Sequence, residues 1–175
     1  TPPRRGLVSP VLFLPMAEET ALIGPPADVT MRLAAALMQE WTRCGIDLPV
    51  AVNLSPTQLT DLTLPDRIAS LLKEFDVNPS QLVVEVTEQA AMADVGKATD
   101  ILTRLRLKSI EVSLDDFGAG YSSLVEIYRM PLSELKFGRS LMVDLDRDAG
   151  ARTVVKALMA LTKELKLPVC AEGVE

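Results

Sequence analysis

The stretch of residues 82–115 decides the fold, because two short apolar runs flank a longer amphipathic one. The runs are Leu82-Val83-Val84-Glu85-Val86 and Ile110-Glu111-Val112-Ser113-Leu114-Asp115. Between them, residues 95–107 carry apolar side chains at helical spacing. Strand, helix and strand in this order form the unit of parallel sheets that have helices on their faces. The stretch therefore predicts an α/β fold.

The same alternation continues on both sides of this unit. Three further runs have the composition of strands, at residues 50–53, 134–137 and 168–172. Helical patterns are found at residues 10–20, 29–44, 65–75, 122–130 and 151–165. The breaker Gly24-Pro25-Pro26 is expected to separate the first two of these helices. Because no linker or low-complexity segment interrupts the pattern, residues 1–175 are expected to form one domain.

The composition describes a globular chain with an acidic balance. Of the 175 residues, 48% are hydrophobic, and 18 basic against 24 acidic side chains give a formal net charge of −6. This balance argues against a broad basic face for duplex DNA or an anionic membrane. No apolar stretch approaches the roughly 20 residues that span a bilayer. Cys44 and Cys170 form no CxxC pair, so we expect a soluble protein of the cytoplasm.

The absence of histidine from the sequence excludes several classes of enzyme. Ser-His-Asp and Cys-His hydrolases, histidine-based acid–base catalysis and the usual zinc sites all require an imidazole. An enzyme with this sequence has to rely on carboxylates and lysine, with a hard metal ion as the candidate cofactor.

Each of the five predicted strands ends in a residue that is able to bind a cation or a phosphate. These residues are Asn53, Glu85, Asp115 with Asp116, Lys136 and Glu172. A charged residue after one apolar run usually marks only the emergence of a strand into solvent. Because all carboxyl ends of a parallel sheet lie on one side, however, five such residues favour a shared site at one face.

The residue types in this predicted site favour a hard metal ion. Asn, Asp and Glu supply only oxygen ligands, which suit Mg²⁺, Mn²⁺ or Ca²⁺ rather than zinc. Adjacent Asp115 and Asp116 suggest two ions, provided that both side chains turn toward the mouth where the strand runs into Gly118 and Gly120. Two ions about 3.5–4 Å apart clamp a phosphodiester and activate a water. Lys136 is then expected to orient or deprotonate that water, or to stabilise charge on the phosphate.

Several ordered segments together resemble a known family. They are Asn53-Leu54-Ser55, Glu85-Val86-Thr87-Glu88, residues 115–124 beginning Asp115-Asp116-Phe117-Gly118, Leu135-Lys136 and Ala171-Glu172-Gly173-Val174-Glu175. In this order they resemble the EAL domains, which are bacterial cyclic di-GMP phosphodiesterases. Residues 6–10 and 15–20 are similar to the early helix of that family, so the resemblance covers essentially the whole chain.

The resemblance implies a modified TIM (β/α)8 barrel that hydrolyses cyclic di-GMP to linear pGpG with Mg²⁺ or Mn²⁺. It implies roles for individual positions: Asn53, Glu85, Asp115 and Glu172 as metal ligands, Asp116 at the second ion, Lys136 at the attacking water, Glu88 as the anchor of the loop after the acidic pair, and Glu175 in support. It also implies a homodimer through residues 117–124 and the helix that follows them.

The sequence departs from the family pattern at three places. The Glu-Ala-Leu segment and the closing C-terminal segment are absent, and Gly138 stands where the family usually has Asp. We therefore expect a partial barrel that belongs to a longer EAL domain, with the isolated 175 residues inactive and poorly stable. An active phosphodiesterase, a degenerate cyclic di-GMP receptor and a partner-binding module remain as alternative functions.

Overall fold

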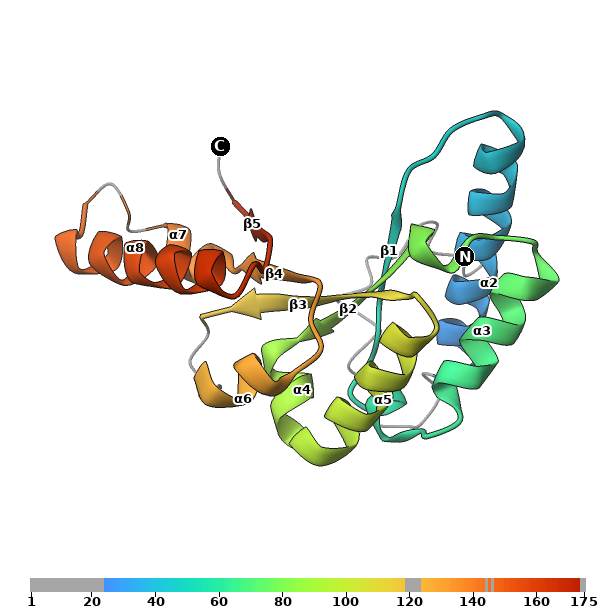
Figure 1. Ribbon diagram of the computed structural model, residues 1–175, viewed down its shortest axis with the longest axis horizontal. Coiled ribbons are helices and arrows are strands. Elements are labelled where there is room, and N and C mark those ends of the chain that lie inside the picture. Colours follow the sequence, from blue (N-terminus) through green and yellow to red (C-terminus); the bar gives the residue numbers. More distant parts are fainter. Residues whose placement is uncertain (1–23, 119–123, 144, 146, 174–175) are drawn as a thin grey trace, which may run out of the picture.

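The protein is built on a five-stranded parallel sheet, seen in a computed structural model that describes residues 24–118, 124–143, 145 and 147–173. The strands follow one another across the sheet in chain order (Figure 1): β1 (Val50–Asn53), β2 (Leu82–Thr87), β3 (Glu111–Phe117), β4 (Glu134–Phe137) and β5 (Val169–Ala171). Within the described residues, β1 pairs only with β2 and β5 only with β4, so the barrel is not closed.

One helix, α2 (Gly24–Arg43), precedes β1, and the other helices lie between consecutive strands. They are α3 (Leu64–Glu74), α4 (Glu88–Ala93), α5 (Val95–Leu107), α6 (Leu124–Arg129), α7 (Arg139–Met142) and α8 (Ala149–Glu164), with single 3₁₀ turns at Gln58–Thr60 and Pro79–Gln81. Connections of this kind are what parallel strands require, because a tight hairpin cannot join them. The observed order confirms the predicted α/β fold.

All five predicted strands are present, with shifts of one or two residues at their ends. The predicted helix at residues 29–44 begins earlier, so Gly24-Pro25-Pro26 belongs to the first turn of α2 and does not lie outside this helix as expected. Prolines in the first turn of a helix need no hydrogen-bond donor and have a suitable φ, so they start the helix instead of interrupting it. Sequence periodicity missed α4 and α7, which are too short to display it. The predicted helix at residues 10–20 lies outside the described residues.

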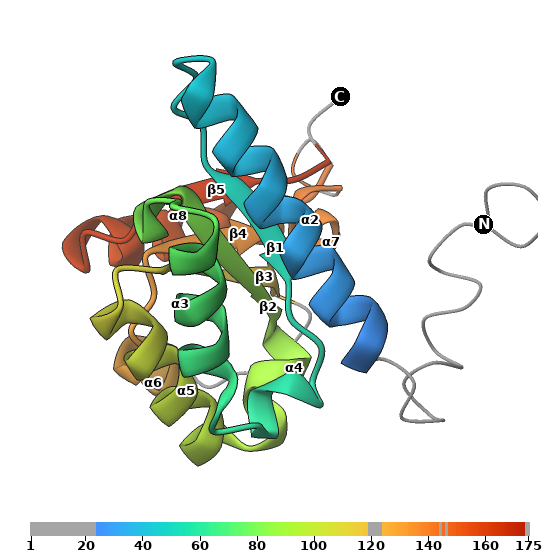
Figure 2. The same cartoon turned by 90° about the vertical axis from the view of Figure 1, so that its right-hand side faces the viewer.

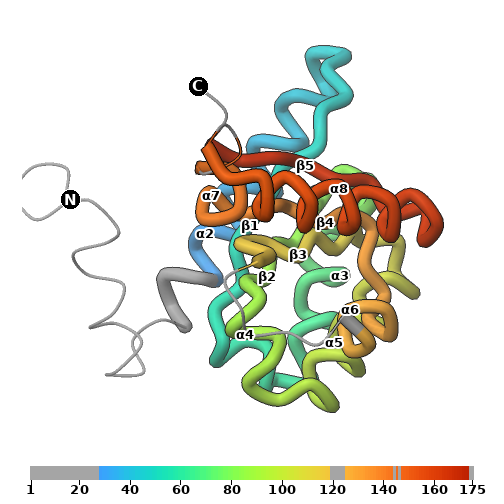
Figure 3. Tube along the Cα trace, turned by 90° about the vertical axis from the view of Figure 1, so that its left-hand side faces the viewer, coloured from blue at the N-terminus to red at the C-terminus, as the bar shows by residue number. Residues whose placement is uncertain are grey.

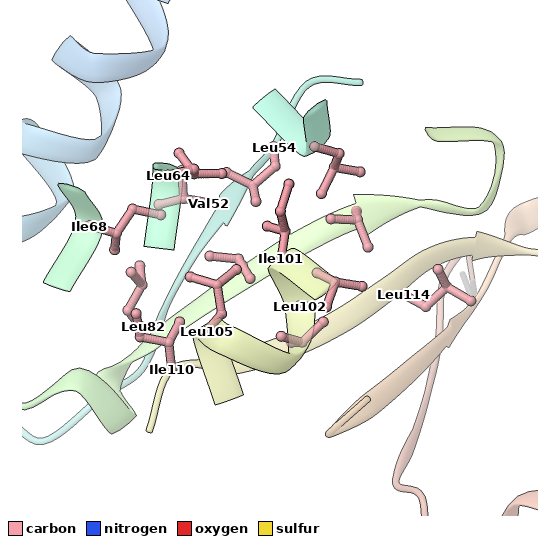
Figure 4. Packing of buried hydrophobic residues seen from close by; sticks show 14 of the residues in the cluster. Val52, Leu54, Leu64, Ile68, Leu82, Ile101, Leu102, Leu105, Ile110 and Leu114 are labelled. Atoms are coloured by element: carbon pink, nitrogen blue, oxygen red, sulfur yellow. The ribbon is translucent and has the colours of Figure 1, made fainter. Parts of the chain in front are cut away.

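One face of the sheet forms the hydrophobic core with α2, α3 and α5 (Figure 2). Figure 4 shows Val52 and Leu114 of the strands packed in the same cluster as Ile68 of α3 and Ile101 of α5. The start of α5 is fixed locally. The Asp94 side chain caps this helix by accepting a hydrogen bond from the backbone N–H of Lys97 (3.1 Å). Because one face of the sheet is buried against the helices, the polar side chains at the carboxyl ends of the strands lie on the opposite face.

The C-terminal helix α8 is covered less completely than the helices near β1. It lies at the β4–β5 end of the sheet, away from α2 and α3 (Figure 1, Figure 3). Val155 and Leu158 pack against the core, but Thr162 is the one fully buried residue of this helix. None of the described helices combines the length and the apolar character that a bilayer crossing demands.

Candidate functional site

The site lies on the face of the sheet opposite the helices, at the carboxyl ends of the strands. Side chains of alternate residues in a strand point to opposite faces, so buried Val84 and Val86 flank Glu85 while facing the other way. The register pairs Asn53 with Glu85 and Thr87 with Asp115. The predicted convergence at this edge therefore follows directly from strand register.

Lys136 connects the two halves of the site. Its Nζ lies 2.5 Å from Glu85 Oε1 and 3.2 Å from Glu172 Oε1. Asn53 Nδ2 in turn donates to Glu85 Oε2 at 3.3 Å. Glu85 is buried, so its charge requires these partners. The side chains of β1, β2, β4 and the residue after β5 thus form one continuous polar chain.

The carboxylates around Lys136 favour its charged form. Burial alone would lower the pKa of Lys136, but its hydrogen bonds to Glu85 and Glu172, and the nearby negative charges, raise this pKa above the ordinary value. The ammonium group therefore stays charged at neutral pH. In this charged form the lysine can orient a water or stabilise an anion.

Asp115, Asp116 and Glu172 form a compact carboxylate cluster. One oxygen of each lies within 4.8 Å of the others. Burial raises the pKa of the Asp115 carboxyl, and the charges of Glu172 and Asp116 add to this effect, while the Asp116 backbone N–H donates to Asp115 Oδ1 (2.9 Å) and opposes it. Carboxylates this close repel one another unless a cation neutralises them, and their oxygens suit a hard divalent ion.

The two adjacent aspartates reach the same side by a different route from the predicted one. Asp116 lies within β3 and has a left-handed backbone, with φ of 54°. At this point the pairing of β3 with β4 shifts register between Leu114 and Phe117, as in a β-bulge. The extra residue turns Asp116 toward Asp115, so the bulge, and not the end of the strand at Gly118, brings the pair together.

Gly138 allows β4 to approach this bulge closely. A Cβ built on Gly138 would lie 3.2 Å from both Cα and the carbonyl carbon of Asp116, and 3.3 Å from Asp116 Oδ1. Any side chain at this position has to displace Asp116 slightly. The residue type at position 138 therefore affects where Asp116 lies in the carboxylate cluster.

Glu88 anchors the start of the loop after β3. It is buried at the first position of α4, and its Oε2 accepts a hydrogen bond from the Gly118 backbone N–H at 2.9 Å. The side chain of Leu141, in α7, packs directly against Gly118 and fills the space that a Cβ on Gly118 would need. Sequence reasoning missed this contact, since Leu141 carries no chemical signal. Residues 119–123 and Glu175 lie outside the described residues.

A second polar pair, also missed from the sequence, lies one layer below the site. Ser113 is completely buried, and its Oγ donates to Glu134 Oε2 at 3.0 Å. Both residues share the face of Asp115 and Lys136, two positions earlier in their strands. Polar residues at alternate positions inside β3 and β4 were the available signal.

Comparisons with known sequences find a matching family model and several similar proteins. A sequence model described as the EAL domain matches residues 2–175. The bifunctional diguanylate cyclase/cyclic di-GMP phosphodiesterase MucR of Pseudomonas aeruginosa is 40% identical over 174 residues, which are 99% of this chain and 25% of MucR. The cyclic di-GMP phosphodiesterase PdeR of Escherichia coli is 34% identical over 173 residues, which are 99% of this chain and 26% of PdeR. The chain thus spans about a quarter of the length of these relatives.

Solved structures support the same fold. The PaMucR phosphodiesterase in complex with c-di-GMP is similar with a TM-score of 0.91 at 40% identity, over 99% of this chain and 70% of that one. The FimX EAL domain has a TM-score of 0.90 at 22% identity, over 99% of this chain and 69% of that one, which concerns the fold alone. The expected modified TIM barrel of EAL type is confirmed, with the barrel open within the described residues.

Proposed function

Because this chain belongs to the EAL domain family, we propose that it is a metal-dependent phosphodiesterase that hydrolyses cyclic di-GMP to linear pGpG. The observation that carries the proposal is the continuous polar chain at the carboxyl edge of the sheet. It links a buried carboxylate, Glu85, through charged Lys136 to the cluster around Glu172. The acidic cluster supplies ligands for divalent cations, and these offset its repulsion toward an anionic substrate.

The proposed metal ligands are the oxygen-bearing side chains of the site: Asn53, Glu85, Asp115 and Glu172, with Asp116 at a second ion. Bound Mg²⁺ or Mn²⁺ would polarise the scissile phosphate and lower the pKa of a water. The compact spacing of Asp115, Asp116 and Glu172 supports the part of this assignment that lies around β3 and β5. Glu85 and Asn53 extend the oxygen-rich surface across β2 and β1.

Lys136 and Glu88 have the proposed non-ligand roles. The charged ammonium of Lys136 holds the attacking water or the phosphate in place, and its two carboxylate partners restrict its position. Glu88 fixes the backbone at Gly118 and thereby the stretch of β3 that presents both aspartates. Glu175 follows Glu172 by three residues and is proposed to support the site.

A product assay with defined metals tests this function. The full-length chain is incubated with cyclic di-GMP in Mg²⁺, Mn²⁺, Ca²⁺ or EDTA, and the products are separated by chromatography. We expect pGpG with Mg²⁺ or Mn²⁺ and suppression by Ca²⁺, because calcium prefers longer and looser coordination. Full activity in EDTA would contradict the metal-ligand assignment.

Gly138 favours a second candidate function, a receptor that binds cyclic di-GMP without cutting it. The close packing of Gly138 against Asp116 leaves no room for the usual carboxylate without displacement of Asp116. Binding of cyclic di-GMP in Ca²⁺, together with an absence of pGpG in Mn²⁺, would establish the receptor. Turnover in Mn²⁺ decides for the phosphodiesterase.

We also propose a homodimer through residues 117–124 and α6. Val125 and Tyr128 of this helix are exposed, 56% and 66% respectively, whereas Ile127 is buried. Two exposed apolar side chains on a short helix are consistent with a contact surface. Tyr128→Glu is expected to shift the sedimentation coefficient toward the monomer, while the same change at exposed Leu107 on α5 should leave it unaltered.

A further inference from the structure

Arg139 lies at the rim of the site and belongs to none of the roles described above. It is the first residue of α7, directly after Gly138 and two residues beyond the end of β4. Its aliphatic stem lies over Gly173, because a Cβ built on Gly173 would be 3.0 Å from Arg139 Cγ and 3.4 Å from its Cβ and Cδ. Gly173 immediately follows Glu172. Arg139 therefore bridges the β4 and β5 sides of the mouth.

The charged groups of Arg139 and Lys136 lie in different surroundings. Lys136 is half-buried and paired with two carboxylates. Arg139 is exposed, and it forms no ion pair with any residue of the described ranges. Because the stem of Arg139 lies against Gly173, next to Glu172, and no described residue pairs with its guanidinium, the donors of this group are available for an anion that arrives from solvent.

Electrostatics indicates which anion suits this position. Four carboxylates, Glu85, Asp115, Asp116 and Glu172, face one lysine in the site, so the centre needs cations before it accepts a phosphate. A cyclic dinucleotide carries two phosphodiester groups, and only one is cut at a time. The uncut group lies away from the metal ligands and needs its own positive partner. A guanidinium binds phosphate oxygens with two parallel hydrogen bonds.

We propose that Arg139 binds the uncut phosphodiester of the substrate and so positions the cyclic dinucleotide across the mouth. This inference rests on the proposed function. Gly173 is part of the device, since its φ of +72° and the contact with the stem of Arg139 both favour a residue without a side chain. Arg139 thereby adds binding at a point remote from the reacting phosphate, and that binding is the same in the ground state and the transition state.

Steady-state kinetics of Arg139→Ala and Arg139→Lys in the full-length chain test this role. We expect Arg139→Ala to raise KM for cyclic di-GMP about tenfold and to change kcat by less than about twofold, since uniform binding is lost. Arg139→Lys keeps the charge but not the paired hydrogen bonds, so an intermediate KM is expected. Arg43→Ala is the matched control, because Arg43 ends α2 at the opposite edge of the sheet and is exposed.

Two further measurements separate this role from a structural one. The loss of kcat/KM in Arg139→Ala should be at least about fivefold larger for cyclic di-GMP than for bis(p-nitrophenyl) phosphate, which has a single phosphodiester. Titration of cyclic di-GMP in Ca²⁺ should show a similar increase in Kd. Equal losses for both substrates, or an unchanged KM and Kd, would overturn the inference and leave the proposed function intact. A wild-type chain that neither binds nor cuts cyclic di-GMP removes the proposed function and this inference together.

Discussion

The two faces of the sheet use the same strands for different purposes. On the helix side, Val84, Val112 and Leu114 are completely buried and belong to one hydrophobic cluster. On the other side, Glu85 and Asp115 are linked through the site to Lys136 and Glu172. Neighbouring residues of one strand therefore contribute to different properties. Substitution of adjacent residues should affect stability on one face and chemistry on the other.

The largest expected effect is on the helix side of β3. Leu114→Ala removes a fully buried side chain and leaves a cavity, so the free energy of unfolding should fall by about 2–5 kcal/mol. Denaturant unfolding measures this loss. Leu107→Ala is the matched control, because Leu107 on α5 is 79% exposed and should change the free energy by no more than about 0.5 kcal/mol. Equal effects at the two leucines would contradict the burial of this face.

The next residue along the same strand should behave in the opposite way. Asp115→Asn is expected to reduce the rate of cyclic di-GMP hydrolysis by about a hundredfold or more. Displacement of a bound ion by about 1 Å is enough for a loss of this size. In metal-free buffer its free energy of unfolding should not fall. Burial raises the pKa of Asp115 in the folded chain, so its ionised form destabilises the fold as pH rises above the unfolded pKa. Wild-type turnover by this variant would remove Asp115 from the site.

The contrast between the faces also explains what could be predicted from sequence. Apolar runs and polar strand ends located the five strands and the convergence of Glu85, Lys136 and Glu172, because register in a parallel sheet is regular. The bulge at Asp116 was not predictable, since it depends on pairing between β3 and β4. The Leu141 contact with Gly118 and the position of Arg139 over Gly173 join segments far apart in sequence. Periodicity carries no information about such contacts.

A smaller effect on the polar face separates catalysis from binding. Lys136→Ala should lower kcat at least tenfold, about 1.4 kcal/mol, while Kd for cyclic di-GMP in Ca²⁺ changes much less. The reason is that charged Lys136, held by Glu85 and Glu172, acts on the water or on developing charge. Lys156→Ala on exposed α8 provides the matched control. Equal losses in kcat and affinity would assign Lys136 a binding role.

The smallest expected effect concerns the amino end of β3, where the polar face serves stability. Glu111 is ion-paired with Arg106 of α5, and the hydrogen bond from Arg106 holds the pKa of Glu111 below its ordinary value of 4.5 despite partial burial. A depressed pKa gives stability that is present above the unfolded pKa and is lost as pH falls through the folded pKa. Glu111→Gln should therefore lower the free energy of unfolding at pH 7 by less than about 1 kcal/mol, because the pair is one-third exposed. Urea titrations at a series of pH values measure the difference, with Glu40→Gln at an exposed position of α2 as control. The difference from wild type should shrink as pH falls below 4.5, and a difference that stays constant would show that Glu111 acts through packing and not through its charge.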